Sequence, residues 1–441
     1  MKVSVLTLGC KVNQYESQAM LEMLQQAGYQ PAENGEKADV YVINSCTVTA
    51  MSDHKARQLL RRLRRDNPTA VLVLTGCMPQ AFPQSAGNWP EADIVLGNQS
   101  RASLLPYLAD YIANGQRIVA ITPHPVQQGQ EPYEPLLVHN FHERTRAFIK
   151  IEDGCNRFCS YCIIPYARGR VRSRAPEEII QEAQQLTQAG YREVVLTGIN
   201  LSAYGQDIGL DLCDAVHAVS QAAGIQRVRL GSLEPEQMDE PALLRLAKEE
   251  KLCPQFHLSL QSGCDATLRR MNRHYNSAEY AAIAANIRRI FPGASLTTDV
   301  MVGFPGETQE EFNQSLAFVQ QIGFAKVHVF AYSRRPGTKA GGMPNQVTNA
   351  VKEERSRQMI QTTQQSRENF LFSQVGTTQP VLLESTGGDG YMEGYTPNYT
   401  PVQVQLCPSP GLQGEILPVK LTGVQGDFCI GTPVSPSSSL V

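Results

Sequence analysis

The N-terminal third of the chain repeats one pattern of apolar and polar positions. Apolar stretches, each ending in a short polar turn, read VSVLTLGC, VYVINSC, VLVLTGC and DIVLGN. Segments with helical spacing lie between them, at 17–27, 53–65 and roughly 100–114. Strands that alternate with helices in this way predict a parallel sheet joined by crossover helices. We therefore expect an N-terminal α/β domain over residues 1–122.

A second series of apolar stretches begins after residue 144. They read AFIKIED, EVVLTGIN, RVRLGS, FHLSLQS, LTTDVMVG and KVHVFAYS, with helical segments such as 176–189, 210–223 and 278–290 between them. Six strand-helix units predict an open, partial (βα)6 version of the eightfold barrel, with its active site at the carboxyl ends of the strands. We assign residues 145–370 to this barrel. Residues 123–144 lose periodicity and collect Pro, Gln and Gly, which predicts a linker.

The end of the chain has a third character. Residues 372–441 are rich in Gly, Pro, Thr and Val and contain short alternating stretches such as VLLES and PVQVQL. This pattern predicts a small β-barrel. The chain as a whole is thus expected to be α/β with a β-rich terminal domain.

Composition and charge narrow the class of protein. With 441 residues, 42% of them hydrophobic and 18% charged, the chain is globular and longer than one core usually organises. The net charge of -3 draws no polyanion to the whole protein, so nucleic acid would need a local basic patch. The first residues lack a long apolar run, and no later stretch reaches membrane-spanning length. We expect a cytoplasmic protein without a membrane segment.

Three of the eleven cysteines directly follow strands of the predicted N-terminal sheet. In a reducing compartment, cysteines more often bind metal than form a disulfide framework. Because parallel strands share a direction, Cys10, Cys46 and Cys77 are expected to meet at the carboxyl edge, where α/β sheets bind ligands. Alternatively, the three cysteines are simply small buried hydrophobic residues. We favour this less because all three occupy the same position relative to their strands. We call these residues the N-terminal triad.

A second group of three cysteines follows the first barrel strand. The segment GCNRFCSYC contains C-x-x-x-C-x-x-C at Cys155, Cys159 and Cys162, the core triad. Three thiolates in one loop suit a 4Fe-4S cluster whose fourth iron stays free for another ligand. A zinc site would need a fourth Cys or His nearby, and the loop has none; His142 and His257 are distant in sequence. Four other cysteines, Cys213, Cys253, Cys407 and Cys429, are expected to be structural, while Cys264 lies near the expected barrel mouth.

The core loop resembles that of the radical S-adenosylmethionine (SAM) superfamily. The resemblance rests on the cysteine spacing, on Tyr161 before the last cysteine and on the place of the loop after the first of six barrel strands. It implies that the open iron binds the amino and carboxylate groups of SAM. It also implies that the reduced cluster splits SAM to a 5'-deoxyadenosyl radical.

Nearly the whole chain resembles the methylthiotransferase family within that superfamily. The words GCKVNQYES, VINSCTVT, TGC and IIPYARGRVRSR resemble the branch that acts on N6-threonylcarbamoyladenosine at tRNA position 37. The resemblance implies a second 4Fe-4S cluster on the N-terminal triad and two SAM molecules, one methylating sulfur and one removing hydrogen from C2 of adenine. It further implies a TRAM-like terminal module, the tRNA anticodon loop as partner, an electron donor such as flavodoxin or ferredoxin, and a sulfur source.

Other functions stay open at this point. Within the family, the target is alternatively isopentenyl-adenosine in tRNA or a ribosomal-protein aspartate. Outside it, the chain would be an iron-sulfur RNA-binding protein without turnover. A free iron is of no use to a mere scaffold, so we favour the enzyme.

The ends of the barrel strands supply candidate SAM-binding residues. A glycine there alternatively only permits a turn, and Gln261 alternatively only satisfies backbone groups. The candidates are Tyr161, Gly198, Asn200, Ser232, Glu234, Gln261, Asp299 and Tyr332.

Two basic runs and two tyrosines are candidates for binding tRNA, although a solvated or ion-paired face is the alternative for each run. The runs supply Arg57, Arg61, Arg65, Arg168 and Arg172. We expect Arg168 or Arg172 to pair with the carboxylate of the threonylcarbamoyl group. Tyr395 and Tyr399 are expected to stack on bases. After residue 369 the chain carries one basic and five acidic residues, the wrong sign for neutralising phosphates.

Overall fold

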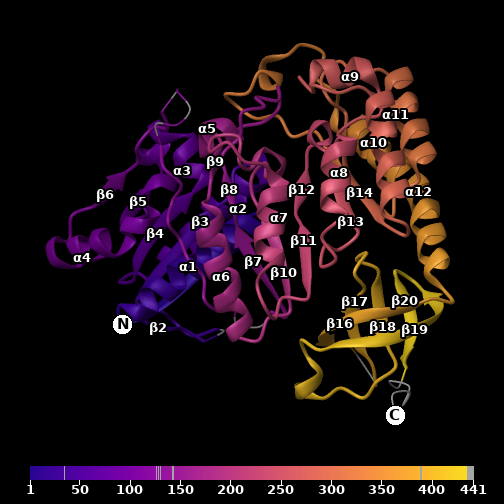
Figure 1. The fold of residues 1–441 in the computed structure, drawn as a ribbon. Coiled ribbons are helices and arrows are strands. Elements are labelled where there is room, and N and C mark those ends of the chain that lie inside the picture. The colour runs from indigo at the N-terminus through magenta and orange to yellow at the C-terminus, as the bar shows by residue number, and fades with distance from the viewer. Residues whose placement is uncertain are drawn as a thin grey trace.

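The computed structural model describes residues 1–33, 35–125, 127, 129, 131–141, 144–387 and 390–434. The chain forms three parts in succession: a parallel sheet with its helices, a half barrel, and a small closed β-barrel (Figure 1). The predicted α/β class with a β-rich terminal domain is confirmed. His142 lies outside the described residues.

The first part is the N-terminal sheet. Its elements are β1 (Lys2–Thr7), α1 (Lys11–Gln26), β2 (Gln30–Pro31), β3 (Val40–Ser45), α2 (Ala50–Asp66), β4 (Val71–Gly76), α3 (Cys77–Ala81), η1 (Pro83–Asn88), β5 (Ile94–Leu96), η2 (Asn98–Ser103), α4 (Leu104–Asn114) and β6 (Ile118–Ala120). The six strands are all parallel, in the order β2-β1-β3-β4-β5-β6. Strands β3 and β4 are buried along their whole length, which explains their continuous apolar sequences.

Helices α1 and α2 begin earlier than their apolar spacing predicts. Helix α1 begins at Lys11 rather than residue 17, because buried Asn13 and Glu16 interrupt the apolar pattern of its first turns. Helix α2 begins at Ala50, where the Thr49 side chain accepts a hydrogen bond from the Ser52 backbone N–H. The sequence therefore places both helices correctly but misses turns whose buried faces are polar.

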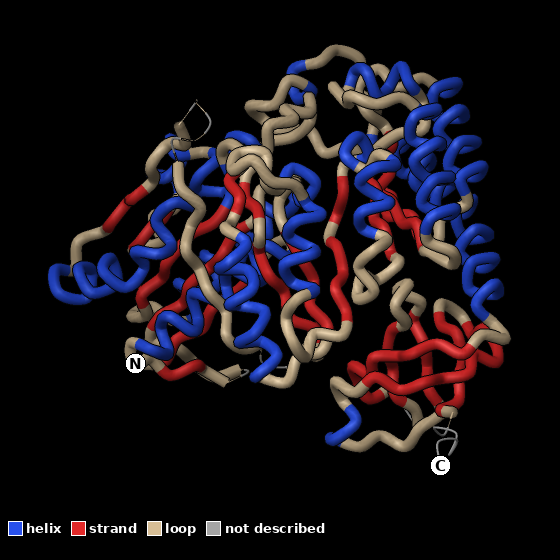
Figure 2. Tube along the Cα trace, viewed as in Figure 1, coloured by secondary structure: helices blue, strands red, loops and turns tan. Residues whose placement is uncertain are grey.

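The second part is the half barrel. Its elements are β7 (Arg146–Lys150), β8 (Glu152–Asp153), α5 (Ile164–Arg168), β9 (Arg172–Ser173), α6 (Pro176–Gln188), β10 (Glu193–Thr197), η3 (Leu201–Ala203), α7 (Leu212–Ser220), β11 (Arg227–Leu230), β12 (Ser232–Leu233), η4 (Pro235–Gln237), α8 (Glu240–Leu246), β13 (Gln255–Leu258), α9 (Asp265–Arg270), α10 (Ser277–Ile290), β14 (Ser295–Val302), α11 (Gln309–Ile322), β15 (Lys326–Ala331), η5 (Ala340–Gly342) and α12 (Asn349–Gln374). Parallel strands run in the orders β11-β10-β7 and β12-β13-β14-β15, and only Gly231 separates β11 from β12. Helices pack against these strands (Figure 2). The carboxyl ends of the strands thus form one continuous edge, as predicted.

Part of the expected linker is buried in the hydrophobic core of the half barrel. Leu136, Val138 and Phe141 are buried in the main hydrophobic cluster of the half barrel. The Tyr15 hydroxyl on α1 donates to the Leu136 carbonyl oxygen at 2.8 Å. This segment therefore connects the N-terminal sheet to the half barrel and packs against both.

The third part, the terminal barrel, docks at the amino ends of the half-barrel strands. It contains β16 (Thr378–Thr386), β17 (Met392–Tyr395), β18 (Pro401–Val404), η6 (Pro410–Leu412), β19 (Ile416–Gln425) and β20 (Phe428–Pro433), closed in the order β16-β17-β18-β20-β19. Arg146 at the start of β7 pairs with Glu384, and Arg192 just before β10 pairs with Glu415 at 2.6 Å. The terminal barrel thus lies at the end of the half barrel opposite the carboxyl edge (Figure 1). Among the described residues, no helix combines the length and apolarity that a bilayer span requires.

Candidate active site

The structure brings the N-terminal triad to the carboxyl edge of the N-terminal sheet. Cys10 caps α1, Cys46 follows β3, and Cys77 opens α3 directly after β4. Burial, reinforced by the neighbouring thiols of Cys77 and Cys10, raises the pKa of Cys46 to about 11. The three thiols are therefore close enough for their charges to interact.

Two glycines permit this close approach of the triad. Gly9 has φ +133°, and a Cβ there would lie 2.9 Å from the Cβ of Cys46. Gly76 has φ +100°, and its Cβ would lie 2.6 Å from the backbone nitrogen of Ser45. The Gly-Cys pairs at the ends of β1 and β4 are therefore required by backbone conformation and by space.

Buried amides support the N-terminal triad. Asn13 donates from Nδ2 to the Ser45 carbonyl at 3.2 Å, and Asn44 donates from Nδ2 to the Asn13 carbonyl at 3.0 Å. The Cys10 thiol in turn donates to Asn13 Oδ1 at 3.2 Å. Sequence reasoning missed both residues, although each lies within a few positions of a triad cysteine.

The core triad lies in the loop between β8 and α5, half-buried at the carboxyl edge of the half barrel. Burial raises the pKa of the Cys155 thiol and raises that of Cys162 to about 12. Asn200 Nδ2 lies 3.7 Å from Cys155 Sγ, and Arg273 Nη1 lies 3.4 Å from Cys159 Sγ. Hydrogen-bond donors thus already face two of the three sulfurs.

The described residues form no preassembled group of ligands for a single metal ion. Across the ranges that the structure covers, no three His, Cys, Asp or Glu side chains converge closely enough to hold one metal ion. In a four-iron cluster each thiolate binds a different iron, so three thiolates need not converge on one point. Half-buried thiols with donors at their sulfurs suit that kind of cluster.

Orphaned polar atoms near the core triad suit a bound polar cofactor. Asn200 Oδ1, Glu152 Oε1 and the Tyr332 hydroxyl are buried and have no hydrogen-bond partner in the described part of the chain. Native structures rarely leave such atoms unsatisfied, so an absent ligand is a direct explanation. A Cβ at Gly198 would lie 2.6 Å from Glu152 Oε2, so Gly198 serves at least to let Glu152 approach.

The remaining SAM-binding candidates are spread along the half-barrel edge. Tyr161 and Tyr332 both pack against Phe304, with ring centroids 6.3 and 5.5 Å away. Glu234 pairs with Arg273, the residue that faces Cys159. Ser232 is exposed at the start of β12.

Two further candidates lie on or beside β14. Gln261 has φ +65°, and its backbone N–H donates to the Asp299 carbonyl at 2.8 Å. Asp299 lies within β14, where its carboxylate is 3.4 Å from His257 Nε2. Of the eight candidates, Asn200 lies next to Cys155, and Glu234 is linked to Cys159 through Arg273.

The structure places Arg168 and Arg172, one of which we predicted to pair with the substrate carboxylate, in a buried ion-pair network. Arg168 is fully buried, pairs with Glu16 and Asp153, and donates from Nε to Cys77 Sγ at 3.2 Å. Arg172 is buried too and donates to the Arg168 carbonyl at 2.9 Å. Spacing alone cannot show that these cations are neutralised by acids from distant segments.

The structure gives Tyr395 and Tyr399, which we predicted to stack on bases, aromatic and cationic partners within the protein. The two rings stack on each other, with centroids 4.6 Å apart and an interplanar angle of 18°. The Arg146 guanidinium lies about 5 Å from both rings, and that of Arg229 lies 4.6 Å from Tyr399. This stack belongs to the interface between the terminal barrel and the half barrel.

The arginines of α2 remain available for a polyanion. Arg57 is exposed and has no ion pair among the described residues. Arg61 and Arg65 pair with Glu91 and Asp66, yet their side chains are 69% and 75% exposed. Such exposed pairs contribute little and exchange readily for phosphate.

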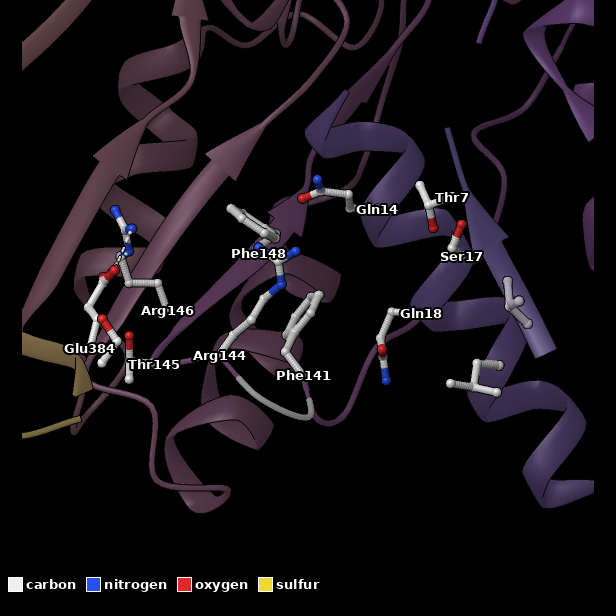
Figure 3. Close-up of a pocket in the computed structure, with 13 residues that line it drawn as sticks. Thr7, Gln14, Ser17, Gln18, Phe141, Arg144, Thr145, Arg146, Phe148 and Glu384 are labelled. Atoms are coloured by element: carbon white, nitrogen blue, oxygen red, sulfur yellow. Dashed lines mark hydrogen bonds and ion pairs between the residues drawn. The ribbon is translucent and has the colours of Figure 1, made fainter. Parts of the chain in front are cut away.

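A polar cleft of about 590 Å³ opens where the three parts of the molecule meet (Figure 3). Gln14 and Gln18 of α1 lie on one side, Glu384 of the terminal barrel lies beside Arg146 on the other, and Arg144 and Phe148 lie between them (Figure 3). None of the six triad cysteines lines this cleft. We therefore place the chemistry at the carboxyl edges instead.

Comparisons with known proteins agree with this geometry. Residues 2–97 match the model described as "Uncharacterized protein family UPF0004", and residues 149–319 match "Radical SAM superfamily". The threonylcarbamoyladenosine tRNA methylthiotransferase MtaB of Bacillus subtilis (strain 168) is 38% identical over 95% of this chain and 93% of its own. The chain belongs to the radical SAM methylthiotransferase family. It is therefore a radical SAM enzyme, and the family implies a 4Fe-4S cluster and SAM.

Other relatives in the family carry two different names. The MtaB of Thermotoga maritima is 36% identical over 90% of each chain. The tRNA-2-methylthio-N(6)-dimethylallyladenosine synthase of Pelotomaculum thermopropionicum is also 36% identical, over 96% of each chain. Among solved structures, the radical SAM methyltransferase TsrM of Kitasatospora setae matches with a TM-score of 0.58 at 15% identity, over 77% of this chain and 74% of that one. The last match concerns the fold alone.

Proposed function

We propose that this enzyme converts N6-threonylcarbamoyladenosine at tRNA position 37 to its 2-methylthio derivative, using two SAM molecules. The proposal rests on the two cysteine triads, each of which lies at the carboxyl edge of a sheet. Helices α1 and α5 connect the two sheets by packing between them. Relatives of 38% and 36% identity named for this reaction support the choice of substrate. The proposed partner is the tRNA anticodon loop.

The core triad would hold the cluster that binds SAM. When bound, this group supplies a radical that removes hydrogen from an aromatic carbon, which no Asp, Glu or His can deprotonate near neutral pH. The Asn200 amide faces Cys155 and leaves its buried Oδ1 free to accept a hydrogen bond. Glu234 orients Arg273, whose charge offsets that of the thiolates beside Cys159. These residues would orient the cofactor and limit its contact with water.

The N-terminal triad would hold a second 4Fe-4S cluster that presents sulfur. Asn13 and Arg168 fix two of its cysteines through hydrogen bonds. Helix α2 begins four residues after Cys46 and runs away from this site, with Arg61 paired to Glu91 just before β5. Its exposed arginines would hold the RNA backbone at a distance from the cluster. An electron donor such as flavodoxin or ferredoxin and a sulfur source complete the reaction.

A second candidate substrate is isopentenyl-adenosine in tRNA. The relative named as a dimethylallyladenosine synthase matches as well, at 36% identity, as one named for threonylcarbamoyladenosine. The two bases differ chemically at N6, where one carries a carboxylate and the other an apolar chain. Direct comparison of the two substrates therefore decides between them.

The test is mass analysis of tRNA nucleosides after reaction with the reconstituted, reduced enzyme. Anticodon stem-loops carrying either N6 group are supplied separately, together with SAM and a sulfur source. We expect the 2-methylthio product with the threonylcarbamoyl substrate and little with the isopentenyl substrate. The reverse preference would overturn the proposed substrate, and failure of the reduced protein to cleave SAM would overturn the enzymatic proposal.

A further inference from the structure

One short helix joins the two triads. Cys162 lies two residues before α5, and Arg168 is the last residue of that helix. Helix α5 packs against α3, whose first residue is Cys77. At the contact, Arg168 donates from Nε to Cys77 Sγ at 3.2 Å. A helix that starts at one set of cysteines thus ends on a sulfur of the other.

Arg168 also reaches a second cysteine of the N-terminal triad through one amide. Its Nη2 donates to Asn13 Oδ1 at 3.3 Å, and the same oxygen accepts from the Cys10 thiol at 3.2 Å. The Arg168 side chain is fully buried, so water does not screen these contacts. One guanidinium therefore lies against two of the three residues expected to carry the second cluster.

Buried acids hold the guanidinium in this orientation. Glu16 of α1 and Asp153 of β8 both pair with Arg168 Nη1. Arg101 pairs with the same Glu16 and with Glu134, but no hydrogen bond joins it to a sulfur in the described part of the chain. Lys150 and Arg172 are buried in the same network and also pair with Asp153. Of these four cations, only Arg168 has a hydrogen bond to a cysteine in the described part of the chain.

We propose that Arg168 is a positioning residue that fixes the second cluster relative to the core loop and raises its reduction potential. The inference rests on the proposed function, since it requires a cluster on the N-terminal triad. Hydrogen bonds to cluster sulfurs and nearby charge are among the factors that set such potentials. A cluster gains negative charge on reduction, so a buried cation at its sulfur stabilises the reduced form more than the oxidised form.

The first test compares Arg168→Gln with Arg101→Gln in the full-length chain. Both variants are made in a background with Cys155, Cys159 and Cys162 replaced by Ala, so that only the second cluster contributes to the EPR signal. Potentiometric titration should show a lower potential for Arg168→Gln. At a fixed potential, the oxidised-to-reduced ratio of the cluster should change about tenfold. This corresponds to a shift in reduction potential of about 59 mV for one electron. Arg101→Gln should leave the potential near that of the parent.

The second test does not depend on Arg168→Gln. The same background protein is labelled with 15N-arginine, and the reduced cluster is studied by electron-nuclear double resonance. We expect a 15N coupling that disappears in Arg168→Lys and persists in Arg101→Gln. This measurement decides the question even if Arg168→Gln does not fold.

Several results would overturn the inference. A loaded second cluster without 15N coupling, or equal potential shifts in the two Gln variants, would reduce Arg168 to a member of a structural ion-pair network. A parent protein that holds no second cluster would overturn the proposed function itself, and this inference with it. An unchanged potential in Arg168→Gln, together with normal product formation when the same substitution is made in the chain that keeps Cys155, Cys159 and Cys162, would also contradict it.

Discussion

The two cysteine triads are built in different ways. The core triad spans eight residues, from Cys155 to Cys162, within the single loop between β8 and α5. The N-terminal triad comes from the ends of three strand-turn segments separated by 36 and 31 residues. The first is therefore set by local spacing, whereas the second exists only after β1, β3 and β4 have paired.

This difference determines what each site tolerates. In the N-terminal sheet, the Cα pairing of Ser45 with Gly76 places the residues that follow β3 and β4 next to each other. A shift of that register would move Cys46 away from Cys77. The core triad depends less on strand pairing and more on the side chains that surround its loop, such as Asn200 and Arg273. Substitutions should therefore break the two sites through different mechanisms.

The largest effect is expected from the core triad. Replacing Cys159 with Ala removes one of only three cluster ligands, so SAM cleavage and product formation should both become undetectable. Iron should fall to about half, since a second four-iron cluster remains. SAM cleavage is followed by chromatography of 5'-deoxyadenosine, with Cys407→Ala as the exposed-cysteine control. Cleavage at the wild-type rate in Cys159→Ala would contradict this assignment.

The next largest effect is expected at Gly76. Ala there must adopt φ near +100° and would place Cβ 2.6 Å from the Ser45 nitrogen, so strand β4 must shift. We expect a loss of about 3 kcal/mol or more of unfolding free energy and loss of the N-terminal iron, with SAM cleavage retained.

The matched control for Gly76 is Gly28→Ala. Gly28 has φ +91° but no heavy atom within 4 Å of its Cβ position, so Ala there introduces backbone strain without a steric clash. Its cost should be about 1–2 kcal/mol without loss of iron. Equal iron content and equal denaturation midpoints in the two variants would show that the close approach of β3 and β4 does not matter.

Much of this architecture could be predicted from the sequence, because it follows from periodicity. Apolar strands followed by cysteines identified both carboxyl edges and placed Cys10, Cys46 and Cys77 together. The buried ion pairs could not be predicted in the same way. Arg168 and Glu16 are 152 positions apart, and only the folded chain shows that the charge of Arg168 is already matched. The contacts of Tyr395 and Tyr399 with Arg146 could not be predicted for the same reason, since Arg146 lies in another domain.

Two buried carboxyl groups offer a smaller test, because the two regions shift their pKa values in opposite directions. Burial, reinforced by the charge of Asp153, raises the pKa of Glu152, near the core triad, to about 8, and outweighs the opposing effects of Arg172 and Lys150. Burial alone would raise the pKa of Glu16, near the N-terminal triad, but Arg101 and Arg168 lower it to about 2. The folded state therefore keeps a proton on Glu152 that the unfolded state has lost above its ordinary pKa.

The sign of the pH dependence follows from proton binding. Between the unfolded pKa of 4.5 and about 8, Glu152 makes the unfolding free energy fall as pH rises, by up to about 1.4 kcal/mol per pH unit. Glu152→Gln should remove this slope and stabilise the protein near pH 8. Glu16→Gln should destabilise it at pH 7, because the stability that Glu16 contributes is lost only as pH falls towards about 2. Urea denaturation from pH 5.5 to 8 measures both, and an unchanged slope in Glu152→Gln would contradict the assignment.

The smallest effect is expected on the surface. Each of Arg57→Ala, Arg61→Ala and Arg65→Ala should remove at most one phosphate contact and lower the slope of log affinity against log salt by about 0.7–0.9. Tyr395→Ala should leave that slope unchanged and lower stability instead, because its ring packs against Tyr399 and Arg146. Binding of anticodon stem-loops across a salt series measures the slopes. Wild-type slopes in all three arginine variants would remove α2 from the RNA-binding surface.

The most direct test of the central claim is the iron content and product yield of one variant, Cys10→Ala/Cys46→Ala/Cys77→Ala. After anaerobic reconstitution, we expect about eight irons in the wild-type chain and about four in the variant, as two four-iron clusters imply. The variant should still cleave SAM and should form no 2-methylthio nucleoside. A variant that keeps about eight irons and makes product would contradict the account of two clusters with separate tasks.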